Sequence, residues 1–316
     1  MGGITVIITA TPLRVSFFGG NTDFPEYFKK YGGAVLTTTI DKFVYCIVNG
    51  RFDDEIRITY SIKEIVTDVN QIKHELVREA MKLVGVTKGI EIMFLSDVPS
   101  EGSGLGSSSS VTVGVLNALH QYKGEQVTAR QLAEEACHIE IDILKKPIGV
   151  QDQYIAAFGG FNLINFGEKT TIVSIDSQGI EKYLMLLYTG KTRESSTILS
   201  KMNLNKEILD KNKELVYLGH ECLSFPHDFG LLIDEYWELK KELNAAVSND
   251  FIDDLYQKAL TSGAWGGKVV GAGGGGFLLL IVPPEKRTQV LKATNLKELP
   301  FNFSIDGSKV IFNIRR

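Results

Sequence analysis

The sequence has few cysteines, and their positions argue against two kinds of site. Only three of its 316 residues are cysteine, namely Cys46, Cys137 and Cys222. They lie far apart and are odd in number, so they indicate neither a disulfide framework nor a CxxC metal site. Such sparing use of cysteine is typical of a reducing compartment, and we expect a cytoplasmic protein.

Long apolar runs and basic clusters are also missing. The longest apolar stretch, near residues 269–282, is interrupted by glycine and is too short to span a bilayer. The opening MGGITVIITA has no basic region, its apolar run is too short for a signal peptide, and Val6 breaks the myristoylation pattern. The net charge is -4, and no run of Lys or Arg is long enough to follow a nucleic-acid backbone. We therefore expect neither a membrane nor a nucleic acid as partner.

The composition that remains is typical of a globular protein with mixed secondary structure. Hydrophobic residues make up 44% and charged residues 23% of the chain, which is long enough for two ordinary domains. Strand-like runs and helical patterns are mixed, and long helical patterns lie between about residues 204 and 260. Because there is no regular βαβ alternation, the pattern predicts an α+β fold. We place the domain boundary near residue 168, which gives domains of residues 1–168 and 169–316.

The most informative segment is PSEGSGLGSSSS, residues 99–110, which follows a strand-like run and precedes a helix-like run. Glycine lets the backbone approach an anion closely, the next helix offers the positive end of its dipole, and serine hydroxyls can bond phosphate oxygens or magnesium. The loop lacks the lysine of a P-loop NTPase and the glycine spacing of a dinucleotide-binding fold. A flexible linker is the alternative, but linkers seldom lie between a buried strand and an amphipathic helix. We predict a phosphate-binding loop made of Gly102, Ser103, Gly104, Leu105, Gly106, Ser107, Ser108 and Ser109.

The segment TPLRVSFFGGNTDF near the start of the chain contains two candidate residues. Arg14 falls among apolar neighbours, where an unpaired cation would be costly. An inward-facing arginine suits a transferring phosphoryl group or a partner carboxylate. Asp23 precedes Phe24 and Pro25, so it can cap a helix, and it can also belong to a site. Both interpretations of Asp23 stay open at this point.

Two more carboxylates are candidates in the middle of the chain. Asp152 stands where a loop enters a helix, so it can act as an N-cap, as a base that accepts a hydroxyl proton, or as both. Glu140 shares the apolar face of a helix expected over residues 129–144. A buried glutamate needs a partner, which is either a metal ion or a basic residue.

A second glycine-rich segment, GAWGGKVVGAGGGGF, joins Lys268 to five glycines between Gly271 and Gly276. A tight turn between two strands is one interpretation, yet two glycines usually suffice for a hairpin. Close approach of the backbone to a ligand is the interpretation that we prefer.

Three of these segments, in this order, resemble the GHMP small-molecule kinases, named for galactokinase, homoserine kinase, mevalonate kinase and phosphomevalonate kinase. The segments are TPLRVSFFGGNTDF, PSEGSGLGSSSS and GKVVGAGGGGF, and they bracket almost the whole chain. The resemblance implies an N-terminal ribosomal-protein-like α+β domain and a C-terminal ferredoxin-like α+β domain. It also implies ATP as phosphoryl donor, Asp152 as base, Arg14 as stabiliser of the transition state, and Mg²⁺ held by Ser108 and Glu140. One extra residue, Gln151, separates Asp152 from the family's proline, here Pro147.

The strings IGVQDQYIAAFGGFN and DFGLLIDEYWELKKEL resemble the bacterial heptose kinases within this family. That resemblance implies phosphorylation of the anomeric hydroxyl of D-glycero-D-manno-heptose 7-phosphate, a small-molecule sugar phosphate, for nucleotide-heptose and surface-glycan synthesis. For a phosphorylated substrate we expect a second anion site at Lys191 and Arg193, whose alternative is a solvated basic turn. The expected substrate-binding residues are Gly19, Gly20, Asn21, Thr22, Asp23, Gln151, Lys191, Arg193, Gly273, Gly274 and Gly275.

Two other functions stay open from the sequence. Another sugar 1-kinase of the same family, such as a fucose kinase, would differ only in pocket residues. A catalytically inactive sugar and ATP sensor would keep the fold and lose turnover, yet Arg14, Ser108, Glu140 and Asp152 are all present. A homodimer is compatible with the sequence, which does not fix the oligomeric state.

Overall fold

The computed structural model describes residues 5–99, 102–191, 198 and 204–315, and in these residues it has two sheets with helices packed on them. The elements are β1 (Thr5–Phe18), α1 (Pro25–Tyr31), β2 (Gly33–Gly50), β3 (Ile56–Thr59), β4 (Lys63–Val66), α2 (Glu75–Val84), β5 (Ile90–Ser96), α3 (Ser107–Lys123), α4 (Ala129–Cys137), α5 (Gln151–Phe158), β6 (Phe161–Phe166), β7 (Thr171–Ser174), β8 (Leu184–Tyr188), α7 (Lys206–Glu221), α8 (Pro226–Leu243), α9 (Asp250–Thr261), β9 (Gly266–Val269), β10 (Phe277–Ile281), α10 (Arg287–Thr294), β11 (Lys297–Glu298), β12 (Phe303–Ser304) and β13 (Lys309–Arg315). This mixture confirms the predicted α+β class.

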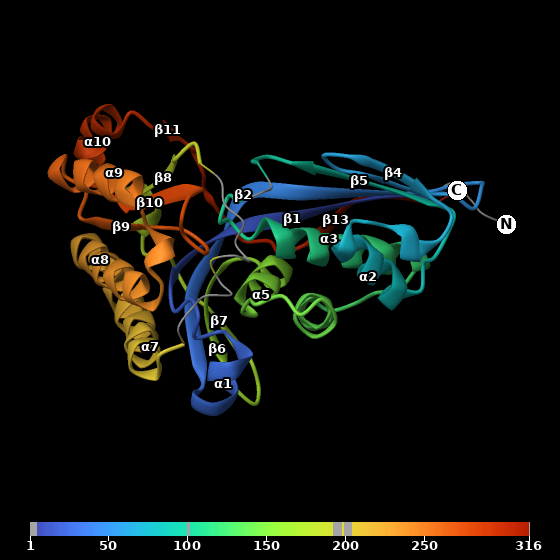
Figure 1. Cartoon of the computed structure of the whole chain (residues 1–316), viewed down its shortest axis with the longest axis horizontal. Helices are drawn as coiled ribbons and strands as arrows, with labels where there is room; N and C mark the ends of the chain where they lie inside the picture. The colour runs from blue at the N-terminus through green and yellow to red at the C-terminus, as the bar shows by residue number, and fades with distance from the viewer. Residues whose placement is uncertain (1–4, 100–101, 192–197, 199–203, 316) are drawn as a thin grey trace.

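The first sheet has nine strands, and its main path runs β13-β1-β2-β5-β3-β4. Strand β2 is 18 residues long and serves two partners: its Val44–Gly50 half pairs with β5, and its Gly33–Thr38 half pairs with β6. Only β3 and β5 run parallel among the described pairs. Helices α2, α3 and α5 lie along one face of this sheet (Figure 1), where an apolar core forms between strands and helices.

The second sheet is antiparallel, with the order β11-β8-β10-β9, and α8 and α9 pack on it, with α10 beside α9. Helix α7 packs on α8 and on β1 and β2 of the first sheet. A second apolar cluster joins the two sheets, because it contains Phe17 of β1 and Leu36 of β2 together with Phe229 of α8 and Ile281 of β10. The two halves of the molecule therefore share a core, and the end of β1 that follows Arg14 is packed between them.

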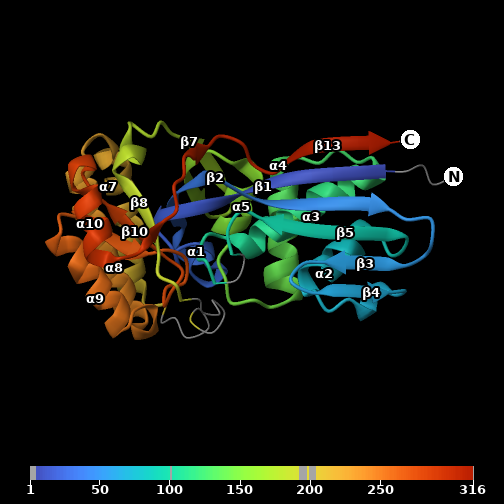
Figure 2. The same cartoon turned by 90° about the horizontal axis from the view of Figure 1, so that it is seen from above.

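The C-terminal residues return to the first sheet. Strand β13 pairs antiparallel with β1, β12 pairs with β2, and β7 pairs with β6. Figure 2 shows β13 beside β1, with both termini at the same end of the molecule. The predicted boundary near residue 168 puts β7, β12 and β13 in the second domain, yet all three pair with strands of the first sheet. Strand β7 pairs with β6, directly before it, whereas the partners of β12 and β13 lie far earlier in the chain.

The predicted helical region is confirmed, and one helix starts earlier than expected. Helices α7, α8 and α9 lie where helical patterns were expected, between about residues 204 and 260. Helix α3 begins at Ser107, inside the serine run, although its helical pattern was recognised only from residue 111. The last serines of the predicted loop therefore form the first turn of a helix.

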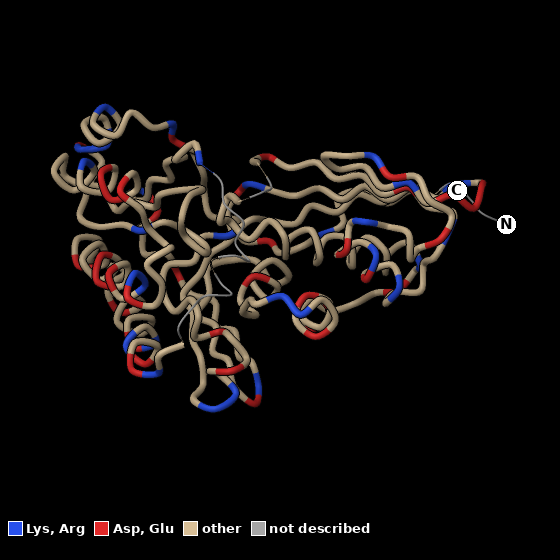
Figure 3. Tube along the Cα trace, viewed as in Figure 1, with Lys and Arg blue, Asp and Glu red and all other residues tan. Residues whose placement is uncertain are grey.

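Most charged residues lie on outer surfaces, with both signs mixed (Figure 3). No helix within the described ranges is long and apolar enough to cross a membrane. The three cysteines are free thiols.

Candidate active site

Five ionisable residues are almost completely buried and line one cavity between the two halves of the molecule. The cavity has a volume of about 1090 Å³, and its wall includes the phosphate loop predicted from the sequence. The five residues are Arg14, Asp23, Glu140, Lys240 and Lys268, each with 5% or less of its surface exposed. Burying charge is costly unless the charge meets a partner, so this concentration marks the cavity as the candidate site.

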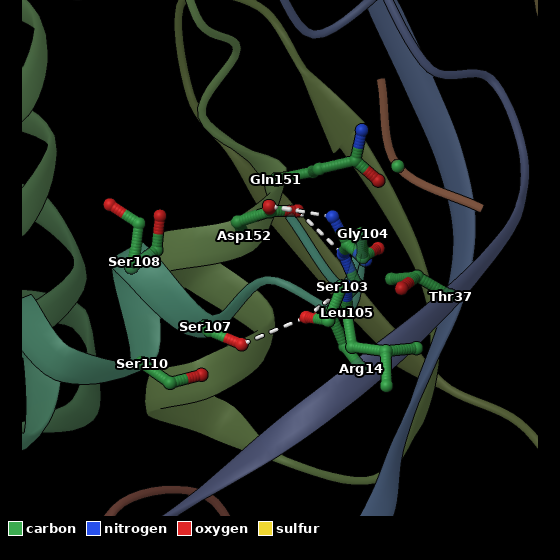
Figure 4. A network of polar contacts seen from close by, with 12 residues as sticks. Arg14, Thr37, Ser103, Gly104, Leu105, Ser107, Ser108, Ser110, Gln151 and Asp152 are labelled. Atoms are coloured by element: carbon green, nitrogen blue, oxygen red, sulfur yellow. Dashed lines mark hydrogen bonds and ion pairs between the residues drawn. The ribbon is translucent and has the colours of Figure 1, made fainter. Parts of the chain in front are cut away.

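Arg14 and Asp152 form a bidentate ion pair at the centre of the site. The guanidinium of Arg14 donates from Nε to Oδ1 of Asp152 and from Nη2 to Oδ2, both over 2.7 Å. Its Nη1 donates to the carbonyl of Gly104, and the backbone N–H of Arg14 donates to the carbonyl of Leu105. Figure 4 shows the Asp152 carboxylate facing this guanidinium. Arg14 therefore joins the phosphate loop to the candidate base, as the sequence analysis expected for an arginine with a carboxylate partner.

The phosphate loop is held in place by glycines that no larger residue could replace without strain. Gly104 has φ +75°, and a Cβ there would lie 2.5 Å from the carbonyl oxygen of Val270. Gly276 has φ +83°, and its Cβ would lie 2.5 Å from the carbonyl oxygen of Ser103. Residues with such φ values pay a steric cost unless they are glycine. The two glycine-rich segments of the sequence therefore pack directly on each other.

The loop leads into the N-terminus of α3, which bears no side-chain cap. The hydroxyls of Ser103 and Ser107 are 3.1 Å apart (Figure 4), and the cavity wall includes Ser107, Ser108 and Ser109. A helix N-terminus carries partial positive charge and presents N–H groups, and it is a ready site for phosphate. This geometry agrees with the predicted phosphate-binding role of the loop, for which a bound ligand would be the test.

Glu140 lies beside the same helix terminus and is fully buried, as its apolar neighbours predicted. The hydroxyls of Ser108 and Ser109 each lie 3.4 Å from its Oε2, whereas its Oε1 has no hydrogen-bond partner among the described residues. Burial raises the pKa of this carboxyl group, and the charge of Lys146 opposes that rise. The expected helix over residues 129–144 is an α-helix only to Cys137, and Glu140 lies on the π-helical turn that follows. Such turns often occur at functional sites.

The oxygen donors around Glu140 fit a magnesium ion. A carboxylate oxygen and a serine hydroxyl are hard ligands of the kind that Mg²⁺ prefers. The described residues contain no cluster of three or more His, Cys, Asp or Glu side chains that could hold a metal by themselves. An ion here would have to complete its coordination with water and with nucleotide oxygens, which is the usual arrangement for Mg²⁺ at phosphate sites.

Neither Asp23 nor Asp152 is a helix N-cap, contrary to one interpretation of each. The N-cap of α1 is Phe24, and that of α5 is Val150. The carboxylate of Asp23 instead accepts hydrogen bonds from the backbone N–H groups of Asn21, at 3.0 Å, and Gln151, at 3.1 Å. Burial raises the pKa of Asp23 to about 6, and the nearby charge of Asp152 adds to the rise. Asp23 thus holds the two candidate substrate-binding segments together.

The predicted substrate-binding residues are only partly brought together. Gly20, Asn21, Asp23 and Gln151 line the cavity, whereas Gly19 and Thr22 do not; the hydroxyl of Thr22 bonds to the carbonyls of Gly19 and Ala34.

The other predicted substrate-binding residues that the structure describes do not line the cavity. Gly273, Gly274 and Gly275 are absent from the cavity wall, and Gly273 and Gly274 pack on Val247. Lys191 is exposed, is absent from the cavity wall, and has its ammonium 4.0 Å from the ring centre of Phe251. Arg193 lies outside the described residues. The geometry therefore gives no support to an anion site around Lys191.

Tyr236 and Lys240 of α8 were not predicted as site residues, and no role was predicted for Lys268. Both lysines and the tyrosine line the cavity. The signal was present in the helical spacing, because Ile233, Tyr236, Lys240 and Leu243 lie on the buried face of α8. Lys240, like Glu140, is a charged residue on an apolar helix face, so it could have been predicted in the same way.

A buried arginine paired with a partly exposed aspartate, beside a glycine-rich loop and a helix N-terminus, is an arrangement suited to a phosphotransferase. Residues 70–160 match the family described as GHMP kinases N terminal domain, and residues 221–295 match GHMP kinases C terminal. The chain belongs to the GHMP kinases, and it is an ATP-dependent kinase.

Individual relatives align with nearly the whole chain. The D-glycero-alpha-D-manno-heptose 7-phosphate kinase of Campylobacter jejuni is 32% identical, over 96% of this chain and 98% of the relative. A crystal structure of a D-glycero-D-manno-heptose 1-phosphate kinase from Bacteroides thetaiotaomicron superposes with a TM-score of 0.79 at 26% identity, covering 96% of this chain and 97% of that one. A putative sugar kinase from Campylobacter jejuni superposes with a TM-score of 0.78 at 30% identity, covering 98% of each chain.

Proposed function

We propose that this kinase transfers the γ-phosphoryl group of ATP to the anomeric hydroxyl of D-glycero-D-manno-heptose 7-phosphate, giving the 1,7-bisphosphate for nucleotide-heptose and surface-glycan synthesis. The observation that carries the proposal is the Arg14–Asp152 pair, which stands between the glycine-rich loop and the cavity. The printed names of the relatives support the substrate, since two of them are kinases of heptose phosphates.

In this proposal the loop of residues 102–109 and the N-terminus of α3 hold the nucleotide phosphates. Ser108 and Glu140 hold Mg²⁺, which when bound offsets the negative charge of the phosphate oxygens. The unpartnered Oε1 of Glu140 supports that role, because a buried carboxylate oxygen needs a cation or a donor.

The acceptor hydroxyl lies at Asp152, whose carboxylate takes its proton as the oxygen attacks the γ-phosphorus. Arg14 orients this carboxylate and offsets the charge that develops on the transferring group. Asp23, Asn21 and Gln151 are placed to bond the sugar hydroxyls; the buried Oε1 of Gln151 has no partner among the described residues and is free to accept such a bond.

We place the reaction in the cytoplasm, where ATP is available and where free thiols such as Cys46 stay reduced.

The test is a substrate panel. The purified protein is incubated with ATP, Mg²⁺ and several sugars and sugar phosphates, while ADP release and the phosphorylated position are measured by phosphorus NMR. An anomeric phosphate formed only on heptose 7-phosphate would support the proposal. Preference for an unphosphorylated sugar, such as fucose, would keep the sugar kinase and overturn the heptose assignment, and no turnover on any sugar would favour a sensor.

A further inference from the structure

Two buried lysines of the second half of the molecule lie in the cavity wall. Lys240 belongs to α8 and Lys268 to β9, and their exposed fractions are 4% and 3%. The proposed reaction as derived above uses neither of them. A lysine is almost never fully buried unless it is paired, so both need an explanation.

The described residues provide backbone carbonyls for these ammonium groups but no carboxylate. Nζ of Lys240 donates to the carbonyls of Val269, at 3.3 Å, and Gly271. Nζ of Lys268 donates to the carbonyl of Phe17 and lies 4.2 Å from the ring centre of Tyr236. Neither lysine forms an ion pair within the described part of the chain.

Their positive charges are therefore only partly compensated. Burial lowers the pKa of Lys240 to about 7, and the nearby charge of Arg14 lowers it further. Burial also lowers the pKa of Lys268, with contributions from Lys240 and Arg14. An anion bound between these side chains would offset the cost, and a phosphate group is suited to it because lysine binds phosphate as a point charge.

The position of the pair indicates which phosphate it receives. The nucleotide phosphates already have the glycine-rich loop, the N-terminus of α3 and the Ser108–Glu140 oxygens. The two lysines come from the opposite half of the molecule. The ammonium group of Lys268 lies over the ring of Tyr236. The hydroxyl of Tyr236 is in turn close to Gly20, since a Cβ added at Gly20 would lie 2.9 Å from it. Gly20 precedes Asn21 and Asp23, which are proposed to bind the sugar. Lys268 thus adjoins the side of the cavity assigned to the sugar, and Lys240, which bonds to the carbonyl of Gly271 beside Gly104, lies between that side and the phosphate loop.

We propose that Lys240 and Lys268 bind the phosphate group that the acceptor already carries, at the end remote from the hydroxyl that faces Asp152. This inference rests on the proposed function and refines it, because it makes the second half of the molecule the part that selects a phosphorylated sugar. It is an alternative to the anion site expected at Lys191 and Arg193, of which Arg193 lies outside the described residues.

The first test uses Lys240→Met and Lys268→Met, which keep an apolar chain of similar size and remove the charge. Lys241→Met is the matched control, since Lys241 is the next residue of α8, pairs with Glu238 and is absent from the cavity wall. We expect KM for heptose 7-phosphate to rise about 10- to 100-fold in each test variant, the usual worth of a hydrogen bond to a charged group. KM for ATP and the rate with unphosphorylated heptose should change little.

Opposite results would overturn the inference. A rise of KM for ATP with an unchanged KM for heptose 7-phosphate would assign the lysines to the nucleotide, and an unchanged KM for both would make them structural. If the methionine variants do not fold, Lys240→Gln and Lys268→Gln retain a donor for the carbonyls and carry the same test.

A second measurement needs no variant and separates this inference from the proposed function. Inorganic phosphate should raise the Tm of the wild-type protein and compete with the phosphorylated acceptor, but not with ATP. The protein could still bind phosphate when it is saturated with an ATP analogue and yet turn over no heptose phosphate. That result would support the anion site and refute the heptose assignment. Competition with ATP alone would refute the anion site, even in an active heptose kinase.

Discussion

Replacing Asp152 by asparagine tests the central pair of the site. Asparagine has the same shape and can still accept one hydrogen bond from Arg14, but it cannot take the proton of the acceptor hydroxyl. General bases typically contribute 10²- to 10⁴-fold to a rate, so kcat should fall by about that factor. The Kd for an ATP analogue should stay within about threefold of wild type, a change of less than about 0.7 kcal/mol.

The same change should cost some stability, because Arg14 stays buried without a full counter-charge. Removing one partner of a buried ion pair costs about 3–5 kcal/mol. Here the side chain of Asp152 is 24% exposed, and the carbonyl of Gly104 still accepts from Arg14. We therefore expect about 1–3 kcal/mol, measured by urea unfolding.

The assay couples ADP release to a fluorescent readout at saturating ATP, and nucleotide affinity is measured separately by calorimetry. Asp142→Asn is the control, because Asp142 is exposed and contacts His138 on the surface. Turnover of Asp152→Asn close to that of the wild type would refute the base assignment. Loss of nucleotide binding to the same degree as turnover would show instead that the pair holds the loop.

Three further perturbations probe the rest of the structure. In urea unfolding, Gly104→Ala should lose more stability than Gly85→Ala. Both glycines have positive φ, but only a Cβ at Gly104 would meet the carbonyl of Val270. Equal losses would contradict the close packing of the two loops. Without metal, Glu140→Gln should keep or raise the Tm, because burial raises the pKa of this carboxyl group and so disfavours its charged form. In the wild type, adding Mg²⁺ to the complex with an ATP analogue should raise the Tm, and Glu140→Gln should abolish that rise. If the rise is unchanged in the variant, Glu140 is not a magnesium ligand. The ring of His120 bonds to Glu135 and Glu125, and both hydrogen bonds raise its pKa, the one with Glu135 most. Its contribution to stability is therefore full below the unfolded pKa and is lost as the pH rises through the folded pKa. His120→Gln should therefore lower the Tm more at about pH 6 than at about pH 9, and a difference that grows with pH would contradict this.

Much of the site could be predicted because its residues are unusual for their place in the sequence. Arg14 and Glu140 are charged residues in apolar patterns, and the loop holds more glycine than a turn needs. Both charged residues are buried in the structure, and backbone atoms leave no room for a Cβ at Gly104, Gly271 or Gly276. Local patterns suffice here because burial and backbone strain are properties of a single position.

The parts that were missed depend on contacts between distant segments. The capping interpretation of Asp23 was wrong because Gln151, 128 residues later, supplies a competing backbone N–H. No local pattern around Lys191 indicates that its ammonium group lies over the ring of Phe251. The pairing of β12 and β13 with the first sheet joins residues more than 250 positions apart, and no local periodicity specifies such a partner.

The placement of β13 beside β1 has a consequence for the order in which the protein is made. During synthesis β1 is translated first, but one of its two neighbours in the sheet is translated last. Until then the hydrogen-bonding groups of β1 on that side form an unpaired edge, which is where nascent strands associate with the wrong partner. The nine-stranded sheet that contains Arg14 receives its last strand, β13, only after all strands of the four-stranded sheet have been translated. A chain that ends at Glu298, the last residue of β11, would therefore contain all four strands of the second sheet but lack β12 and β13 of the first.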